Sequence, residues 1–284
     1  MQESLKEINI TKDMRDRFGV AEIAIYEPKP TQVSPKIDSE RVVTGFERLD
    51  LHNNGTYSIR TIEFDGMMVI HTYSGSSKGP INAVARILEL PRSSISEFGR
   101  VAMNKSSRPS TRVQVSFSNR YSPPPKVVCW FEGFEVGHEK NLRIRTWAES
   151  ITETGCVIAL EGWAFTDARR LDVCWFAHSV DHPHVVTGRH SIIKRGFHSD
   201  HNLGPFERVS FPEGKFPKRR PHVFAAISVL DLTREFNARC EIQVSGVTQT
   251  GMKIGLSPWW DTDCHQADYS WLAFDEDFYK NYLI

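Results

Sequence analysis

The alternation of apolar and polar residues predicts that most of this chain forms short β-strands. Residues 142–148 and 240–244 alternate strictly between the two kinds. In a strand, this period of two buries the isoleucines and places Arg143 and Arg239 on the outer face. Polar turns and prolines separate such runs roughly every 8–12 residues. The pattern therefore predicts an all-β fold of small antiparallel β-sandwiches.

The chain contains an internal repeat with an offset of 96 residues. Comparing residues 141–177 with 237–273 gives 13 identities in 37 positions, whereas chance gives roughly two or three. The two copies occupy about 110–178 and 205–275. A duplicated unit of this length indicates tandem modules. The expected domains are an N-terminal region at 1–100, a first module at 101–180 and a second module at 185–278.

An ordered set of residues, present in both copies, resembles the H-type lectin module of snail and slime-mould agglutinins. In the first copy the set comprises Phe117, Pro124-Pro125, Val127, Phe134, Asn141, Arg143, Thr154-Gly155, Trp163, Thr166, Trp175 and Ala177. In the second copy it comprises Phe211, Pro221, Val223, Leu230-Asp231, Arg239, Thr250-Gly251, Trp259, Thr262, Trp271 and Ala273. The resemblance covers about 65 residues of each copy.

The resemblance implies a six-stranded sandwich that usually trimerises. It also implies binding of galactose or N-acetylgalactosamine in shallow clefts between neighbouring modules. The family's binding Arg corresponds to Arg143 and Arg239, and its binding Trp corresponds to Trp163 and Trp259. These positions are therefore the first candidates for glycan contact.

Other positions depart from the family's pattern. The family's His is Ala164 in the first copy and Trp260 in the second, and its Tyr is Arg169 and His265. For the family's Asp, the second copy offers Asp200, while the same count in the first copy reaches Ser106. The departures leave the expected fold intact and put the sugar preference in question, most of all for the first copy.

Elementary chemistry supports the same candidates without the resemblance. A guanidinium offers several donors in a rigid fork that suits vicinal hydroxyls, and a carboxylate accepts from them. An indole supplies a flat apolar face for the C–H side of a pyranose. The resulting carbohydrate-binding set comprises Arg239, Trp259, Trp260, His265, Asp200, Arg143 and Trp163, with Asp261 beside it.

Structural roles compete with binding at several of these positions. Trp175 and Trp271 lie inside apolar strands, which favours the sandwich core. For Trp259 both core and binding remain open, and for Arg239 an ion pair is the alternative. The Thr-Asp pairs at 166–167 and 262–263 favour turns over ligand contact.

Composition narrows the partners and the compartment. Lys and Arg total 35 and so do Asp and Glu, so no net field favours nucleic acid. The sequence shows no signal peptide and no apolar stretch of membrane-spanning length. We therefore expect a cytoplasmic protein, with unconventional release as an alternative. The five cysteines form no CxxC pair, and this predicts buried, reduced thiols.

Two further patterns give weaker indications of a metal site or a catalytic site. The linker holds His178, His182 and His184, whose spacing could ligate a metal. We favour an incidental histidine count there, and expect no metal and no cofactor. The run Gly75–Gly79 matches the G-x-S-x-G motif around Ser77. A hydrolase would need a parallel sheet and downstream triad partners, so a flexible turn is the better interpretation and we expect no enzyme.

The first hundred residues are harder to assign. Residues 60–69 predict a hairpin around Asp65-Gly66, and for residues 81–90 a helix is one possible structure. Residues 42–45 echo 185–188, since both read Val-Val-Thr-Gly. The region is therefore either a small β/α unit or a decayed partial repeat, because too little chain lies between residue 64 and the first copy for a complete third module.

Together these observations predict a lectin that binds glycans or glycoconjugates through tandem modules. Weak single-site affinity would be raised by several sites presented at once, through two modules and homo-oligomerisation, with a trimer as one arrangement. The alternative is a structural or protein-interaction sandwich that has lost sugar binding.

Overall fold

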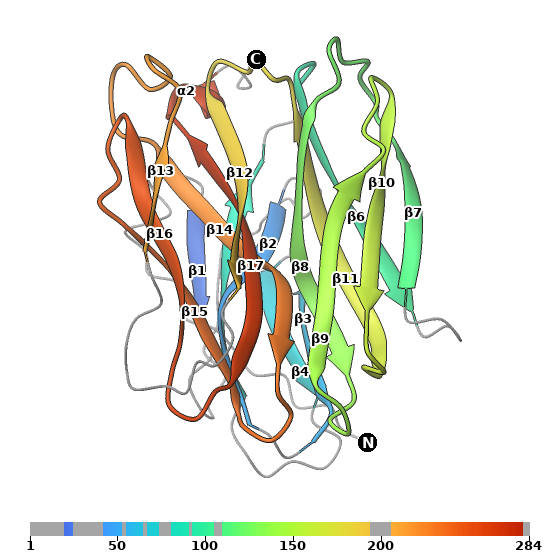
Figure 1. Ribbon diagram of the computed structural model, residues 1–284. Helices are drawn as coiled ribbons and strands as arrows, with labels where there is room; N and C mark the ends of the chain where they lie inside the picture. The colour runs from blue at the N-terminus through green and yellow to red at the C-terminus, as the bar shows by residue number, and fades with distance from the viewer. Residues whose placement is uncertain are drawn as a thin grey trace.

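The computed structural model describes residues 20–24, 42–52, 55–64, 67–73, 81–90, 93–104, 110–193 and 206–280. Almost every element in these ranges is a β-strand, and one helical turn, α2 (Asp277–Lys280), follows the last strand (Figure 1). The all-β prediction is therefore confirmed. The strands are β1 (Val20–Ala24), β2 (Val42–Leu51), β3 (Tyr57–Phe64), β4 (Met67–Tyr73), β5 (Ile81–Glu89), β6 (Ser96–Asn104), β7 (Ser110–Ser116), β8 (Lys126–Val136), β9 (Leu142–Glu149), β10 (Gly155–Gly162), β11 (Ala168–His178), β12 (Val185–Ile193), β13 (Glu207–Ser210), β14 (His222–Leu232), β15 (Ala238–Ser245), β16 (Gly251–Pro258) and β17 (Cys264–Phe274).

The two repeat copies fold alike, each from six strands. In the first copy β6, β11 and β8 lie side by side, and so do β7, β10 and β9. In the second copy the same roles fall to β12, β17 and β14, and to β13, β16 and β15. All of these pairings are antiparallel. Each copy is thus a three-on-three β-sandwich whose two layers belong to different sheets.

The N-terminal strands form a further unit of the same plan. In chain order we call the three the N-terminal unit, the second unit (the first repeat copy) and the third unit (the second repeat copy). Strands β1, β5 and β2 lie side by side in the order of β12, β17 and β14, and β3 pairs with β4 as β9 pairs with β10. A counterpart of β7 is not among the described strands. Residues 81–89 form β5, and the helix that the sequence left open there is absent, because the segment is the central strand between β1 and β2.

The three units exchange half-sheets in a closed cycle. Half of the N-terminal unit (β1-β5-β2) continues into β15-β16-β13 of the third unit. The other half of the third unit (β12-β17-β14) continues into β9-β10-β7 of the second unit. The second unit's remaining strands (β6-β11-β8) continue into β3-β4 of the N-terminal unit. Every sheet therefore crosses a boundary between units, and the ring closes within one chain.

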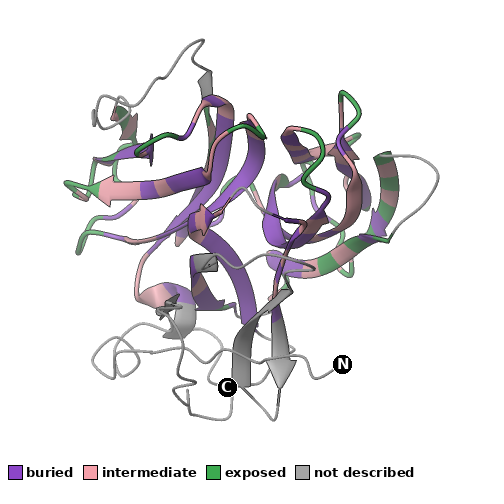
Figure 2. Cartoon of the chain, turned by 90° about the horizontal axis from the view of Figure 1, so that it is seen from below, coloured by how far each residue is buried: buried purple, intermediate pink, exposed green. Residues whose placement is uncertain are grey.

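Three strands line the centre of this ring. Strands β2, β8 and β14 lie against one another, and seen end-on the buried segments face inward (Figure 2). At one level of this centre the three strands contribute Gly45, Trp130 and Ala226. A Cβ on Gly45 would collide with the Cβ of Ala226 and would lie 2.7 Å from Cδ1 of Trp130. One indole therefore fills a level at which the other two strands carry only small residues.

The structure settles several other expectations from the sequence. Strands β3 and β4 pair from Ser58–Tyr73 to Phe64–Met67, which confirms the hairpin. Trp175 and Trp271 are buried in the core, and all five cysteines are buried and free. The echo between 42–45 and 185–188 does not mark equivalent strands, because it falls on β2 and β12. The motif around Ser77 lies outside the described residues.

Candidate functional site

Each boundary between units brings together a residue near the start of one strand and an acidic residue near the end of another. At the first boundary Arg239 of β15 lies opposite Asp50 of β2. Its Nε donates to Oδ1 of Asp50 at 2.7 Å, and its Nη1 donates to Oδ1 of Asp261 at 2.5 Å. We call this arrangement the Arg239 junction. The guanidinium therefore joins two units of the chain electrostatically.

Arg239 does not face solvent, contrary to the prediction from the strand pattern. Its side chain is 6% exposed. Strand β2 adds Asp50 on one side, and the indole of Trp260 lies 5.2 Å from the guanidinium carbon. Trp260 itself is 64% exposed. The pattern predicted the side of the strand correctly but could not include the neighbouring unit that covers it.

A second boundary repeats the pair in a more open form. Arg143 of β9 lies opposite Asp231 of β14, and its Nε donates to Oδ1 of Asp231 at 2.8 Å. The Arg143 side chain is 25% exposed, about four times the fraction of Arg239. We call this the Arg143 junction. It retains guanidinium surface that a ligand can reach.

The loops after β10 and β16 explain the difference in exposure. They run Trp163-Ala164-Phe165 in the second unit and Trp259-Trp260-Asp261 in the third. Ala164 and Trp260 share a left-handed backbone, with φ of 50° and 57°. The indole and carboxylate that cover Arg239 are thus replaced by a methyl group and by Phe165, which is 90% exposed. The Arg143 junction therefore lacks a cover.

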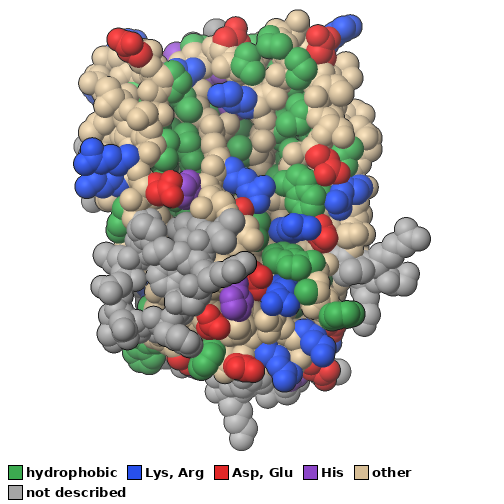
Figure 3. Space-filling view, in the orientation of Figure 1, with side chains coloured by type: hydrophobic (Ala, Val, Ile, Leu, Met, Phe, Trp, Pro, Cys, Tyr) green, Lys and Arg blue, Asp and Glu red, His purple; other side chains and the backbone are tan. Residues whose placement is uncertain are grey.

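The two aligned tryptophans both lie against an arginine. A guanidinium lies over Trp163 at 5.2 Å, from Arg145 of β9, and another lies over Trp259 at 4.8 Å, from Arg48 of β2. Both indoles are half-buried. Arg145 belongs to a surface over β7, β9 and β10 on which arginines and carboxylates are interleaved (Figure 3). One face of each tryptophan is therefore already occupied by a cation.

His265 belongs with Arg143 and not with Arg239. It lies on β17, in the bulge where Cys264 pairs with Leu232 and Gln266 pairs with Asp231. Strand β14 separates β17 from β9 in that sheet. His265 is half-exposed, lies 3.9 Å from Oδ2 of Asp263, and is thus one strand away from Arg143, next in sequence to the residue that pairs with Asp231. The predicted set consequently divides between two boundaries.

The third boundary has a different residue at the strand position that Arg143 and Arg239 occupy at the other two. Ser58 of β3 lies opposite Glu135 of β8, where the other boundaries have Arg and Asp. Arg169, the residue aligned with His265, lies 3.8 Å from Oε1 of Glu135 and pairs with Asp167 at 2.8 Å. A guanidinium is thus present at this boundary, but it comes from a different strand.

Sequence reasoning missed the acidic partners Asp50 and Asp231 as site residues. Asp231 stood in the matched pattern, and Glu135 precedes it by the repeat offset of 96 residues. That shared acidic position was the available signal. The proposed acidic residue, Asp200, and its first-copy counterpart Ser106 lie outside the described residues.

The linker histidines form a separate cluster. His178 is buried, and its ring nitrogens contact Ser179 O at 2.7 Å and Thr187 Oγ1 at 2.9 Å. Burial lowers the pKa of His178 to about 4 and that of His182 to about 3, with the charges of neighbouring Lys and His residues as lesser causes. Both rings are therefore neutral at physiological pH.

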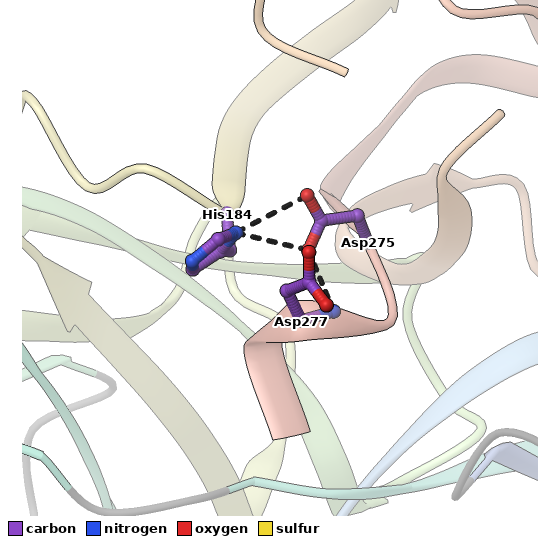
Figure 4. Close-up of side chains that lie close together, drawn as sticks. All are labelled: His184, Asp275 and Asp277. Carbon is purple, nitrogen blue, oxygen red and sulfur yellow. Dashed lines mark hydrogen bonds and ion pairs between the residues drawn. The ribbon is translucent and has the colours of Figure 1, made fainter. Parts of the chain in front are cut away.

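His184, Asp275 and Asp277 lie within reach of one another (Figure 4), with ligand atoms no more than 4.8 Å apart. The two carboxylates are already engaged. Asp275 Oδ1 accepts from the backbone nitrogens of Asp277 and Phe278, at 3.0 and 3.2 Å, and thereby caps α2. Asp277 accepts from Lys218 at 2.9 Å. These bonds explain the cluster without an ion.

Comparison with known families decides what the repeated unit is. The family model of the H-type lectin domain matches residues 112–178 and 207–274. The chain carries two tandem H-type lectin domains. The first match extends from β7 to the end of β11, and the second from β13 to the end of β17. No curated protein matches the chain.

The two matched domains indicate a general function, carbohydrate binding. H-type lectin domains bind carbohydrate and are not enzymes. Both junction arginines lie within the matched segments, whereas Asp50 lies outside them. In the described part of the chain, no helix is long and apolar enough to cross a membrane.

Proposed function

We propose that this H-type lectin binds galactose- or N-acetylgalactosamine-type glycans at the boundaries between its units. The observation that carries the proposal is the Arg–Asp pair repeated at two boundaries, which joins Arg143 to Asp231 and Arg239 to Asp50. An ion pair of this kind presents both donors and acceptors to the hydroxyls of one sugar.

The Arg143 junction is the better candidate for direct contact. Its guanidinium is bound by one carboxylate and is partly exposed, whereas Arg239 is bound by two and is covered by an indole. Phe165, in the loop after β10 of the same unit, offers further exposed surface. At the Arg239 junction, ligand contact would fall instead to Trp260 and Asp261.

The closed ring affects how many glycan-binding sites one chain can carry. The sequence suggested oligomerisation as the source of several sites, but the half-sheet exchange already creates boundaries within one chain. Sites on one rigid ring would act together on a multivalent glycan surface.

The proposal is tested on a glycan array followed by titration of the selected glycan against Arg143→Gln. We expect an affinity loss of at least tenfold, since a hydrogen bond to a charged group contributes about 1.5–3 kcal/mol. Arg120→Gln is the matched control, because Arg120 is a 76% exposed arginine in an ion pair with Glu153. Unchanged affinity in Arg143→Gln would refute this site.

The alternative function is a protein-interaction sandwich without sugar binding. The replacement of the family's His by Ala164 and Trp260, and the enclosure of Arg239, favour it. An array that gives no signal for any glycan, with folded protein, would support this alternative.

A further inference from the structure

The second unit contains a cavity of about 390 Å³ that the glycan proposal does not use. We call it the Glu97 pocket. It lies between β6 and β7, the two edge strands of the second unit's sandwich, and is lined by Ser93, Glu97, Phe98, Ser116, Ser118, Asn119 and Trp175. Its volume falls within the range of roughly 300–1,000 Å³ usual for small-ligand sites. It is distinct from the boundaries that carry the Arg–Asp pairs.

Glu97 is the charged group of this pocket. The residue is 6% exposed. Its two carboxylate oxygens accept from the backbone nitrogens of Ser118 and Asn119, at 2.8 and 3.3 Å. Within the described part of the chain no Lys, Arg or His pairs with it. The carboxylate is thus held in place by neutral donors, and no cation among the described residues balances its charge.

The negative charge of Glu97 affects the pKa values of neighbouring side chains. Burial raises the pKa of Cys156 to about 11, and the negative charge of Glu97 adds to that rise. The pKa of Tyr121 is also raised by burial first and by Glu97 second. The Tyr121 hydroxyl is buried, and the side chains of Glu97 and Asn119 both lie close enough to influence its pKa. A second polar group therefore lies beside the carboxylate.

The third unit shows what this position looks like without the charge. Gly99 pairs with Trp175 and Gly188 pairs with Trp271, so Glu97 corresponds to Val186, two residues earlier in each strand. Likewise Tyr121 packs on Phe117 at 5.4 Å, in the place where Phe216 packs on Phe211 at 5.2 Å. Two apolar residues of the third unit are thus replaced, at adjoining positions, by a carboxylate and a hydroxyl.

The remaining walls favour a ligand with an apolar side. Trp175, which is 6% exposed, supplies aromatic surface, whereas the side chain of Phe98 follows Glu97 in β6 and packs on the opposite face of the sheet. Ser116 and Ser118 are exposed at the mouth. Asn119 donates through Nδ2 to the carbonyl of Ser93 at 2.8 Å, which leaves its amide oxygen as an acceptor. Aromatic surface beside an unbalanced carboxylate is a suitable environment for an organic cation.

We propose that the Glu97 pocket binds a small organic cation through a primary ammonium group. The ammonium donates to Glu97 and to the acceptors around it, while its alkyl chain packs against Trp175. This ligand supplies the positive charge that the described residues do not place beside Glu97.

The test is a titration with n-butylammonium, followed by NMR of the Trp175 indole N–H, which is assigned from the Trp175→Phe variant. We expect a saturable shift with the wild-type chain and at least a tenfold weaker response in Glu97→Gln. Glu213→Gln is the matched control, because it removes an exposed carboxylate from the corresponding turn of the third unit. It should titrate like the wild type.

Two further arms separate the explanations. The Ser118→Leu variant keeps Glu97 and the backbone N–H that binds it but narrows the mouth, so it should also lose the response. n-Butanol, which is neutral and of similar size, should not saturate. An equal response to butanol, an unchanged response in Glu97→Gln, or no response to butylammonium at all would overturn the proposal and leave Glu97 as an anchor for the turn at 118–119.

Discussion

A single arginine position has two different roles in this chain. Arg239 is buried and neutralised by Asp50 and Asp261, whereas Arg143 is partly exposed and neutralised by Asp231 alone. The same residue therefore holds units together at one boundary and remains reachable at the other. Whether an arginine binds or stabilises is decided by what covers it.

The Arg239→Ala variant should be strongly destabilised. Its loss leaves two carboxylates at a unit boundary without their cation, and breaking such a pair costs about 3–5 kcal/mol. Urea denaturation measures the change. Arg219→Ala removes an exposed arginine paired with Glu276 and should cost less than about 1 kcal/mol. Equal stability of the two variants would contradict the assigned role of Arg239.

The buried imidazole of His178 should make the fold sensitive to acid. Burial lowers its pKa to about 4 from 6.5, so the folded state favours the neutral ring. Its contribution is complete above pH 6.5 and is lost as the pH falls toward 4. At pH 5 the loss is at most about 2 kcal/mol.

The variant His178→Phe tests this, because Phe274 occupies the corresponding position of the third unit. Its urea midpoint should fall less between pH 7 and pH 5 than the wild-type midpoint does. Parallel pH profiles would show that His178 does not titrate with unfolding. His182, whose pKa is also lowered, leaves part of the acid sensitivity in place.

At the scale of elements, the loops after β10 and β16 distinguish the two domains. They join equivalent strands and begin with the same tryptophan, yet only the third unit's loop covers its arginine. Two residues, Trp260 and Asp261, make that difference. A short loop thus sets access to an otherwise repeated strand.

Transplanting this loop should close the Arg143 junction. In the double variant Ala164→Trp with Phe165→Asp, the new tryptophan can keep the left-handed backbone of residue 164, because Trp260 has the same backbone conformation. We expect reduced exposure of Arg143 and at least a tenfold loss of affinity for the glycan bound there, measured by calorimetry. Phe165→Ser alone, which adds no cover, is the control. Undiminished affinity in the double variant would show that cover does not control this site.

The sequence predicted the sandwich copies well, because identical residues recur at fixed spacing. For the N-terminal region the sequence left a decayed partial repeat and a small β/α unit as alternatives, since Ser58 stands at its junction position and its strands lack the paired tryptophans. Its similarity to the other two units lies in the order of its strands, and this order is known only once the strands that pair with β2 and β3 are known. Likewise, the sequence placed Arg239 on one face of its strand but did not predict the burial of its side chain, because Asp50 is remote in sequence.

At the scale of the whole molecule, the ring centre makes the three units non-interchangeable. Trp130 spans the centre, donates from Nε1 to the carbonyl of Thr44 at 2.8 Å and packs 5.1 Å from the ring of Phe224. Gly45 and Ala226 make room for it. A ring of three identical units could not fill this level with one indole.

Trp130→Ala should therefore destabilise the whole chain. Removing a fully buried indole leaves a cavity at the meeting point of three strands, with an expected cost of about 3–5 kcal/mol. Thermal unfolding should show a single lowered transition. Trp147→Ala, at a half-buried surface position, should have a much smaller effect. A loss confined to one domain's signals would contradict a shared centre.

The closed ring also predicts a monomer. Each unit already meets two others inside the chain, so we expect light scattering to give the mass of one chain, 32.5 kDa. A concentration-independent mass of about three times this value would show that the boundaries within the chain do not replace those between subunits.

The half-sheet exchange finally constrains how the protein is made. Strand β2 lies near the start of the chain, and its outer neighbour β15 begins only at Ala238. During translation the N-terminal unit therefore waits, with the edge at β2 uncovered, until β15 has left the ribosome. Contacts this remote in sequence slow folding and expose strand edges to aggregation. A ring that closes within one chain thus makes Asp50 depend on a partner, Arg239, that is synthesised 189 residues later.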